Sequence, residues 1–413
     1  MKKFFLVIFL ITIIQNNSYS QEGWFVQYGS PTSDFTRVFM IDSLNGWALD
    51  SDSVFNTTNG GFNWVYNNIG YSSYEDVYFI NINTGWIITS LSIINTTNTG
   101  QNWVSQFYGA TQYRVYFVDA NTGFTISGMP LCRYTTNSGN NWITFSIGIG
   151  TTAFLSIDFV NHDTGWIGGA NGVLFKTTNC GINWVQKNTG ADTRFYGLSF
   201  VSVDTGWAGG FNNFGDSKIL FTSTGGESWL VKYTDPINQG VENIFFTAAK
   251  KGWAMGFPGK IIFTTDAGIT WQLQNSNAGN IHLFSGCFIN SSTGWIVGEV
   301  GGANGKILKT TTGGIVPVEN NSGKIPKDFK LFQNYPNPFN ISTIIEYDLP
   351  YNCYVNMTIF NVLGDEVKTL INQSQQKGKH RIIWDADNYS SGLYFYQLRA
   401  DRFSETKKMI LIK

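Results

Sequence analysis

The chain has 413 residues, of which 13% are charged and 16% are aromatic, and it contains 45 glycines and 14 tryptophans. Few charges together with many turn-forming glycines and strand-forming aromatics favour an all-β protein. The 27 basic and 28 acidic residues give a formal net charge of −1 without a long run of either sign, which argues against nucleic acid or an anionic membrane as a partner.

The first twenty residues have the pattern of a secretory signal peptide. Lys2 and Lys3 precede an apolar run from Phe4 to Ile14, and polar and small residues follow as far as Ser20. A transmembrane helix needs about twenty apolar residues, which this run does not reach. We therefore predict cleavage near Ser20, so that residues 1–20 are removed and no transmembrane span is left.

A repeat of about forty residues then extends over residues 21–315. The dipeptide Gly-Trp recurs in register at six positions, and Gly123-Phe124 replaces it once, at intervals of 38 to 46 residues. The Gly-Trp copies begin at Gly46, Gly85, Gly165, Gly206, Gly252 and Gly294. An aromatic residue or a methionine stands upstream of each copy, at Met40, Phe79, Phe117, Phe159, Phe200, Phe246 and Phe288.

Downstream of six copies is an octet that ends in tryptophan, such as TTNGGFNW at 57–64 and TTDAGITW at 264–271. We interpret these octets as hairpin turns: a short polar side chain accepts backbone N–H groups, a glycine supplies the positive φ, and the tryptophan packs back on the hairpin. The polar residue at the third position is Asn59, Asn98, Asn137, Asn179, Thr224 and Asp266 in the six octets.

These octets resemble the Asp-box motif, S-x-D-x-G-x-T-W, of neuraminidase-repeat proteins. Together with the Gly-Trp copies, the repeat looks like the β-propeller family of the photosystem II stability and assembly factor. The resemblance implies a propeller in which the Asp box is a structural turn away from any active site. The chain departs from the motif by using Asn or Thr at most copies, and an Asn side chain accepts the same hydrogen bonds as an Asp.

The two ends of the repeat complement each other. The seventh copy stops at Thr310–Gly314 without its tryptophan strand, while the mature chain opens on Trp24-Phe25-Val26-Gln27, similar to the residues after the fourth octet. Pairing of the first strand with the last blade would leave no open sheet edge. We therefore predict a single seven-bladed β-propeller; the alternatives are a six-bladed ring with a remnant and an open solenoid.

The repeat ends in a segment of linker composition, residues 316–328, and a second pattern occupies residues 329–413. We predict short strands at Thr343–Leu349, Tyr354–Phe360, His380–Trp384, Leu393–Arg399 and Lys407–Ile412, which together read as a small Ig-like β-sandwich.

This second pattern resembles the type A C-terminal sorting domain of the type IX secretion system. The matching segments are NYPNPFN (334–340), IFNVLGDEV (359–367), SGLYFYQL (391–398) and KKMILIK (407–413). The resemblance implies that the secretion machinery recognises residues 329–413 and that the protein reaches the cell surface or the medium.

Several kinds of chemistry are not indicated. A sialidase needs three arginines that clamp a carboxylate, whereas the repeat contains only Arg37, Arg114, Arg133 and Arg194 and no Arg-Ile-Pro segment. His162 and His282 lack a third ligand at a recognisable spacing, and the four cysteines (Cys132, Cys180, Cys287 and Cys353) are widely spaced. No metal or other cofactor is therefore predicted; export permits a disulfide, but the sequence does not require one.

We expect an exported binding module for a glycan, a peptide or an envelope protein, and not an enzyme. The alternative is a secreted glycoside hydrolase with an unrecognised carboxylate pair about 5 to 10 Å apart. An assembly role by analogy with the photosystem factor would rest on the fold alone, and the sorting domain argues against it.

A candidate ligand site follows from aligning the blades. The position nine residues before each Gly of Gly-Trp or Gly-Phe is mostly polar, at the start of what we expect to be the innermost strand. It is occupied by Arg37, Asp76, Arg114, Ser156, Gly197, Asn243 and Ser285. The predicted ligand-binding residues are Arg37, Asp76 and Arg114 with their neighbours Tyr74, Glu75, Tyr113, Arg194 and Tyr196. The alternative is a channel lining that only satisfies its own hydrogen bonds.

Arg133 interrupts an otherwise apolar column in the strand before each octet. Two interpretations remain open: a residue that faces a ligand, or an aliphatic stem packed in the blade with its guanidinium directed to solvent.

Overall fold

The computed structural model describes residues 23–109, 112–128, 131–148, 153–235, 240–314, 326–334, 337–339, 342–386 and 389–412. The predicted signal peptide and most of the predicted linker lie outside these residues. One compact unit spans residues 21–316, and a second contains residues 317–413.

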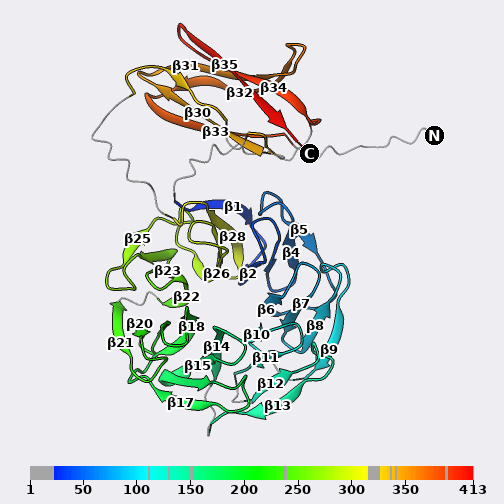
Figure 1. Ribbon diagram of the computed structural model, residues 1–413, viewed down its shortest axis with the longest axis vertical. Coiled ribbons are helices and arrows are strands. Elements are labelled where there is room, and N and C mark those ends of the chain that lie inside the picture. The colour runs from blue at the N-terminus through cyan, green and yellow to red at the C-terminus, as the bar shows by residue number, and fades with distance from the viewer. Residues whose placement is uncertain are drawn as a thin grey trace, which may run out of the picture. The chain divides into compact units, whose positions relative to one another are not determined.

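The first unit is a ring of seven four-stranded antiparallel sheets, the blades of a β-propeller (Figure 1). The innermost strands are β2 (Arg37–Met40), β6 (Tyr74–Phe79), β10 (Arg114–Phe117), β14 (Phe154–Phe159), β18 (Arg194–Phe200), β22 (Val241–Ala248) and β26 (His282–Phe288). The second strands begin on the repeated glycine or beside it: β3 (Gly46–Leu49), β7 (Gly85–Thr89), β11 (Gly123–Ile126), β15 (Gly165–Gly169), β19 (Gly206–Phe211), β23 (Lys251–Gly256) and β27 (Gly294–Val300).

The outer half of each blade consists of the strands that flank the octets. The third strands are β4 (Val54–Thr57), β8 (Ser92–Thr96), β12 (Leu131–Thr135), β16 (Val173–Thr177), β20 (Ser217–Thr222), β24 (Lys260–Thr264) and β28 (Ala303–Thr310). The outermost strands are β5 (Val65–Asn67), β9 (Val104–Tyr108), β13 (Ile143–Ser146), β17 (Val185–Asn188), β21 (Leu230–Asp235), β25 (Gln272–Gln274) and β1 (Phe25–Ser30). A 3-10 turn, η1 (Ala170–Gly172), joins β15 to β16.

The N-terminal strand closes the ring, as the sequence predicts. β1 pairs antiparallel with β28, with Phe25 opposite Lys309 and Ser30 opposite Gly305, so the seventh blade has the strand order β26-β27-β28-β1. The inner strands β2 and β26 are also in contact. The prediction of seven blades is therefore confirmed, and the six-bladed ring and the open solenoid are not observed.

An aromatic interlock joins neighbouring blades. The tryptophan of a Gly-Trp pair stacks on the upstream aromatic residue of the next blade, and the octet tryptophan of that next blade meets the same ring edge-on. Trp47 and Phe79, for example, have ring centroids 3.4 Å apart, and Trp103 meets Phe79 edge-on at 6.0 Å. The equivalent stacks are Trp86–Phe117, Phe124–Phe159, Trp166–Phe200, Trp207–Phe246 and Trp253–Phe288.

The repeated glycine makes this interlock sterically possible. A Cβ on Gly85 would lie 2.4 Å from the ring of Phe79, closer than carbon atoms approach. The same conflict would arise at Gly123, Gly165, Gly206, Gly252 and Gly294, each with the aromatic residue six positions upstream. The absent side chain therefore leaves the space that the ring occupies.

The octets form hydrogen-bonded turns. In the first, the hydroxyl of Thr57 accepts the N–H of Gly61 at 2.8 Å, and the Asn59 Oδ1 accepts the N–H of Asn63 at 2.9 Å. In the other octets, the third-position side chain accepts the backbone N–H of the residue four positions later. The acceptors and their donors are Asn98 and Asn102, Asn137 and Asn141, Asn179 and Asn183, Thr224 and Ser228, and Asp266 and Thr270. Asn, Thr and Asp thus all stabilise this turn.

The second unit is a β-sandwich of a three-stranded and a four-stranded sheet. The first sheet contains β29 (Lys330–Leu331), β30 (Ser342–Leu349) and β33 (Gly378–Asp385), and the second contains β32 (Glu366–Gln375), β31 (Cys353–Phe360), β34 (Gly392–Ala400) and β35 (Phe403–Leu411). Its core includes Tyr347, Trp384 and Tyr396. The sequence did not predict β32, because this edge strand is mostly polar and partly exposed and lacks a clear alternation.

We expect Trp24→Ala to weaken ring closure. Trp24 is fully buried, meets Phe288 edge-on at 5.7 Å, and donates its indole N–H to Gln274 at 2.8 Å. Removal of such a ring costs about 3–5 kcal/mol. The measurement is the urea midpoint of propeller unfolding in the mature chain. Phe214→Ala is the control, because Phe214 is 83% exposed. Equal midpoints for the two variants would contradict this role of Trp24.

Candidate binding site

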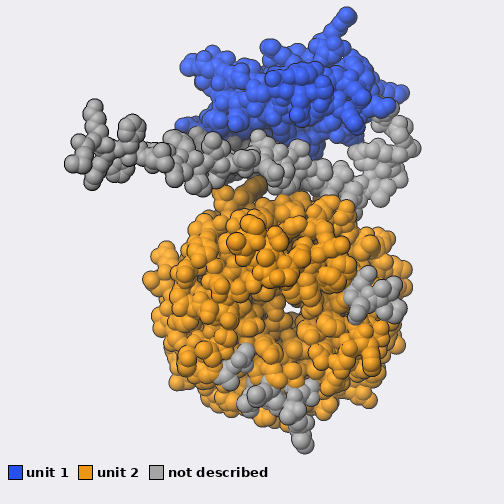
Figure 2. Space-filling model, turned by 180° about the vertical axis from the view of Figure 1, so that it is seen from behind, with its two compact units in different colours: residues 1–20, 317–413 blue, residues 21–316 orange. Residues whose placement is uncertain are grey.

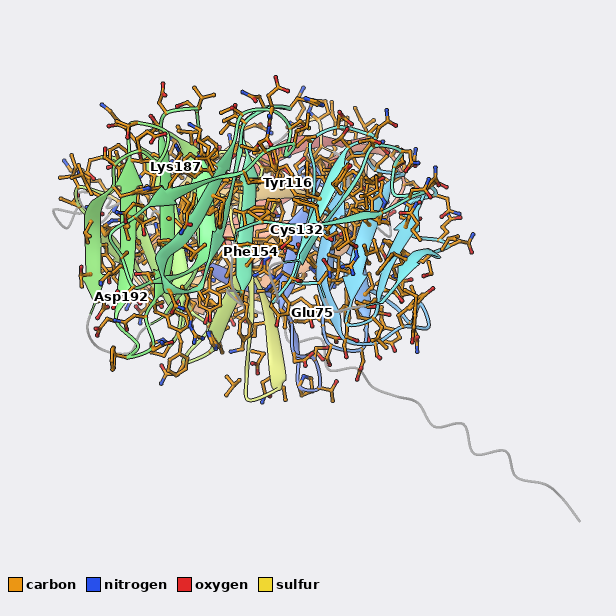
Figure 3. The ribbon with its side chains drawn as sticks, turned by 90° about the horizontal axis from the view of Figure 1, so that it is seen from below. Glu75, Tyr116, Cys132, Phe154, Lys187 and Asp192 are labelled. Carbon is orange, nitrogen blue, oxygen red and sulfur yellow. The ribbon has the colours of Figure 1, made fainter. Side chains whose placement is uncertain are left out.

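The polar positions identified in the sequence lie together on one face of the propeller, where the innermost strands begin; we call this the mouth face. Arg37 and Arg114 are the first residues of β2 and β10. Figure 3 shows Glu75 near this face and Lys187 near the opposite one. A narrow opening passes through the propeller in the space-filling view (Figure 2).

A recurring β-bulge shapes the mouth face. In β6, Tyr74 pairs with Thr89 and Asp76 with Ile88, so Glu75 is an extra residue without a partner in the ladder. β14, β18, β22 and β26 shift register at the same place. A bulge redirects the side chains around it. The residue before the extra one is buried in all five strands: Tyr74, Phe154, Phe195, Val241 and Leu283.

Much of the polar column connects neighbouring blades. The Asp76 Oδ2 accepts the N–H of Val115 at 2.9 Å, and the Ser156 hydroxyl donates to the carbonyl oxygen of Phe195 at 2.7 Å. Each of these bonds reaches the innermost strand of the next blade. The shorter residues of the column therefore contribute hydrogen bonds to the ring itself, in agreement with the alternative interpretation of the channel lining.

Farther from the mouth, polar side chains of the channel wall also form hydrogen bonds to the next blade. The hydroxyls of Tyr78 and Tyr116 donate to carbonyl oxygens of the next blade, at 2.9 and 3.0 Å. The Asp158 Oδ2 accepts the N–H of Phe200 at 2.6 Å, also in the next blade. Burial raises the pKa of Asp158 to about 7, although the hydrogen bond opposes this shift.

Charged groups gather at the mouth and form the mouth cluster, which consists of Arg37, Glu75, Asp76, Arg114, Glu242 and His282. The Arg37 Nε lies 3.6 Å from the Asp76 Oδ1. Arg37 and Arg114 each donate an Nη1–H to the carbonyl oxygen of the preceding residue at 2.7 Å. The His282 Nε2 lies 2.8 Å from the Glu242 Oε1.

The pKa values show that these charges act on one another. Burial raises the pKa of Glu75 and of Asp76, and the nearby Arg37 and Arg114 oppose both shifts. Burial and the charge of Arg37 lower the pKa of Arg114 to about 10, against the attraction of Asp76, Glu75 and Glu242. Residues from blades 1, 2, 3 and 6 therefore share one electrostatic environment.

Glu242 and His282 were not predicted from the sequence as members of this cluster. A signal for Glu242 was present, because Glu242 stands one residue before Asn243 of the polar column, as Glu75 stands before Asp76. Both glutamates occupy the extra position of a bulge. His282 was considered only as a metal ligand.

The remaining predicted residues differ in their accessibility. Tyr74 is 3% exposed, and its hydroxyl donates to the carbonyl oxygen of Tyr71 at 2.9 Å, so it belongs to the core and not to a ligand site. Tyr113 is half-buried, and Tyr196 stacks on Phe211 at 4.8 Å. Arg194 begins β18, and its buried Nε has no hydrogen-bond partner among the described residues.

Arg133 does not direct its head to solvent. It is 5% exposed, and its guanidinium carbon lies 4.3 Å from the ring centroid of Phe107 in the neighbouring blade. Its Nε and Nη1 have no hydrogen-bond partner among the described residues. The expectation of an exposed guanidinium is thus wrong, because a cation–π contact holds the group inside the blade interface.

In the part of the chain that the structure describes, no group of three His, Cys, Asp or Glu residues is placed to hold a metal ion. The same residues contain no helix with the length and apolar character needed to cross a bilayer.

Comparison with known proteins supports both units. Residues 333–413 match the family of secretion system C-terminal sorting domains. The chain is similar to the solved structure of YCF48 bound to D1 peptide, with a TM-score of 0.58 and 19% identity over 71% of this chain and 99% of that one. YCF48 from Cyanidioschyzon merolae gives a TM-score of 0.58 and 17% identity over 70% and 98% of the two chains.

The WD40 β-propeller domain of Doa1 is also similar, with a TM-score of 0.52 and 13% identity over 69% of this chain and 97% of that one. No curated protein matches the sequence. At such identities, the structural likenesses establish the propeller fold alone.

The chain is therefore an exported β-propeller protein with a C-terminal sorting domain. The sorting domain marks it for the type IX secretion system, which delivers proteins to the cell surface or the extracellular space.

Asp158→Asn should change the pH dependence of stability. The folded-state pKa of about 7 lies above the value of about 3.9 expected in the unfolded chain, so Asp158 destabilises the fold as pH rises from about 4 to 7. An amide cannot ionise and still accepts the N–H of Phe200. The stability of the variant relative to the original protein should rise by up to about 1.4 kcal/mol per pH unit between pH 4 and 7. Urea unfolding at several pH values measures it, and a constant difference would contradict the assignment.

Proposed function

We propose that residues 21–315 form a binding module for a polypeptide segment of another exported or envelope protein, and that the mouth face holds this ligand. The proposed contact residues are Arg37, Glu75, Arg114, Arg194 and Glu242, with Tyr113 and Tyr196 beside them. Residues 329–413 serve the separate task of recognition by the secretion machinery, joined to the propeller by a linker at 316–328.

The observation that carries this proposal is the incomplete hydrogen bonding of the arginines. The buried Nε of Arg194 has no hydrogen-bond acceptor among the described residues, and the Nε of Arg37 has only the Asp76 carboxylate, at 3.6 Å and beyond hydrogen-bond distance. A buried donor without a partner costs about 1–3 kcal/mol, and a ligand carbonyl or carboxylate that draws the guanidinium outward would supply the missing acceptor. Glu75 and Glu242 place acceptors for ligand N–H groups in the same cluster.

The mixed charge of the cluster favours a peptide over a polyanion. Arg37 and Arg114 are balanced by Glu75, Asp76 and Glu242. A ligand with both donors and acceptors, as a peptide backbone has, fits such a surface. A similar fold has been solved with a bound peptide, the YCF48 structure, which gives a precedent for this class of ligand on a propeller.

The test is binding of the mature chain, residues 21–413, to a peptide array and a glycan array. We expect peptide binding that falls at least about tenfold in the double variant Arg37→Gln/Arg114→Gln, since each arginine contributes charge-assisted hydrogen bonds. Lys187→Gln is the matched control on the opposite face. Circular dichroism of each variant verifies its folding. Peptide binding that survives the double change, or that both variants weaken equally, would contradict a site at the mouth face.

The alternative function is that of a glycoside hydrolase, and the same mature chain can be used to test it. Glu75, Asp76 and Glu242 all act on Arg114, so several carboxylates meet at the mouth. Release of reducing ends from an oligosaccharide panel, abolished by Glu75→Gln, would favour hydrolysis over binding. No release by the original protein would favour the binding module.

A further inference from the structure

A second concavity lies on the mouth face, at the seam where the N-terminal strand closes the ring. It has a volume of about 330 Å³ and is lined by residues of β1, the β1–β2 loop, the β3–β4 turn, β4 and β5. Arg37 pairs with Leu49 across β2 and β3, so the turn after Leu49 belongs to the mouth face. Neither the polar column nor the mouth cluster includes these residues. The lining consists of Tyr28, Ser30, Thr32, Ser33, Asp50, Ser51, Asp52, Ser53, Phe55 and Tyr66.

Three aromatic rings form one side of this pocket. Phe55 is the central ring, with Tyr28 at 5.9 Å and Tyr66 at 5.7 Å between centroids. Phe35, which is fully buried, packs on Phe55 at 5.0 Å and fixes its position. Tyr66 is 56% exposed, so its ring is open to solvent on the outer side, whereas Phe55 is 4% exposed and meets the hollow from within. Ring faces at the rim of a hollow are what an organic cation contacts in cation–π recognition.

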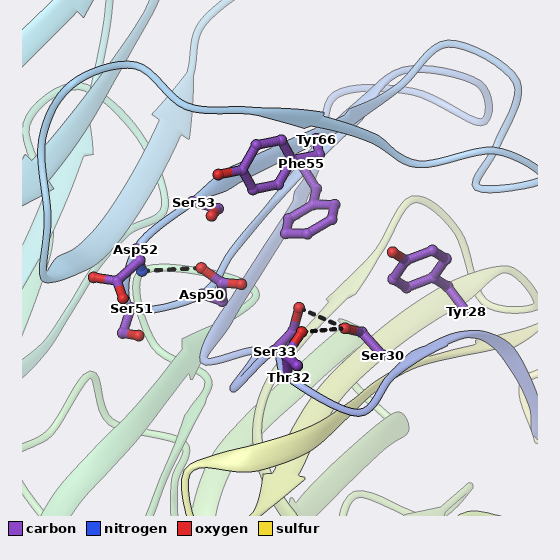
Figure 4. A pocket seen from close by; sticks show the side chains of 10 residues that line it. All are labelled: Tyr28, Ser30, Thr32, Ser33, Asp50, Ser51, Asp52, Ser53, Phe55 and Tyr66. Atoms are coloured by element: carbon purple, nitrogen blue, oxygen red, sulfur yellow. Dashed lines mark hydrogen bonds between the residues drawn. The ribbon is translucent and has the colours of Figure 1, made fainter. Parts of the chain in front are cut away.

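Carboxylates form the opposite side. Asp50 is 6% exposed and points into the hollow across from Tyr28 (Figure 4). Its Oδ1 accepts the N–H of Asp52 at 3.0 Å, while Asp34 beside it accepts the N–H of Ser51 at 2.7 Å. Burial and the charge of Asp34 raise the pKa of Asp50, although hydrogen bonds from Asp52 and Ser33 oppose this. Burial, and after it the charge of Asp50, raises the pKa of Tyr28, so the carboxylate also acts on this ring.

Two other acids of the mouth face have a cation as partner, whereas these acids have none among the described residues. Asp76 is paired with Arg37, and Asp235 with Lys260. No described Lys, Arg or His nitrogen lies within 4.0 Å of the carboxylates of Asp34, Asp50 or Asp52, among all the ion pairs of the described residues. A neutral sugar could use the hydroxyls and rings but would leave this charge uncompensated. A cation satisfies the rings and the carboxylates together.

We infer that this pocket binds the cationic end of a lysine or arginine side chain. The alkyl stem would lie against Phe55 and Tyr66, and the ammonium or guanidinium would meet Asp50, with the serine hydroxyls as further acceptors. The inference rests on the proposed function only for the source of the cation, a polypeptide held on the same face. The pocket is two strands from the channel, about 10 Å at the spacing of paired strands, so one extended segment can reach both.

The test is a titration of the mature chain with Nα-acetyl-lysine methylamide and Nα-acetyl-arginine methylamide, followed by NMR. The glutamine amide is the neutral control, cadaverine represents a free amine, and cellobiose represents a sugar. We expect saturable millimolar binding of the two cationic amides, at least about tenfold weaker binding of the glutamine amide, and weakening at high salt. Asp50→Asn should reduce the affinity about tenfold and Tyr66→Ala severalfold.

Asp163→Asn is the matched control, because Asp163 is an exposed acid of the β14–β15 turn, at the opposite face. Tyr66→Ala keeps the test valid if Asp50→Asn fails to fold, since Tyr66 is largely exposed. Four results would overturn the inference. The glutamine amide could bind as tightly as the cationic amides, or cellobiose could bind more tightly than they do. The cationic amides could fail to bind at about 20 mM, well above the expected millimolar Kd, or a folded Asp50→Asn variant could keep its affinity.

The outcome is separable from that of the proposed function. Amide binding that survives Arg37→Gln/Arg114→Gln while peptide-array binding is lost supports both sites. Peptide binding at the mouth without amide binding overturns only this inference. Amide and cadaverine binding without any peptide binding would overturn the proposed function and identify a free amine as the source of the cation.

Discussion

The stack of one tryptophan on the aromatic residue of the next blade is the contact on which the rest of this propeller depends. Trp86 on Phe117, for example, has its ring centroid 3.5 Å away, and both side chains are almost fully buried. The upstream aromatic side chain needs a glycine beneath it, an octet tryptophan at its edge, and a neighbouring blade on each side. These requirements repeat at six of the seven junctions, with Met40 in place of the aromatic residue in the first blade, and they bring the first strand of the chain to the last blade.

Close packing of the innermost strands determines where ligand chemistry is available. Polar side chains inside the channel form hydrogen bonds with the adjacent strand, as Asp76, Ser156 and Asp158 do. Groups that lack such partners occur where the strands begin and at the closing seam. The β-bulges add to this effect, because they release Glu75 and Glu242 from the ladder. The mouth face therefore combines a rigid frame with side chains whose hydrogen bonding is incomplete.

Repetition explains how much the sequence predicts. The seven aligned copies predict the seven blades. Comparison of the copies also shows that the last one lacks its tryptophan, and this missing residue predicts the role of Trp24. Alignment also places Arg37, Asp76 and Arg114 on one face. It does not reveal the bulge that buries Tyr74 and exposes Glu242 to the cluster, since a bulge depends on pairing with the second strand. The seam pocket was not predicted, because its lining combines β1 of the seventh blade with loops and outer strands of blade 1, whereas the alignment followed the innermost strands.

The aromatic interlock is tested most directly by Gly85→Ala, compared with Gly29→Ala in the mature chain. The new Cβ at position 85 would lie 2.4 Å from Phe79, whose ring is held by Trp47, whereas no atom lies within 4 Å of a Cβ at position 29. Overpacking of this kind costs about 1–3 kcal/mol. Urea unfolding should show that loss for Gly85→Ala and a change within about 0.5 kcal/mol for Gly29→Ala. Equal stability of the two variants would contradict the interlock as the basis of the fold.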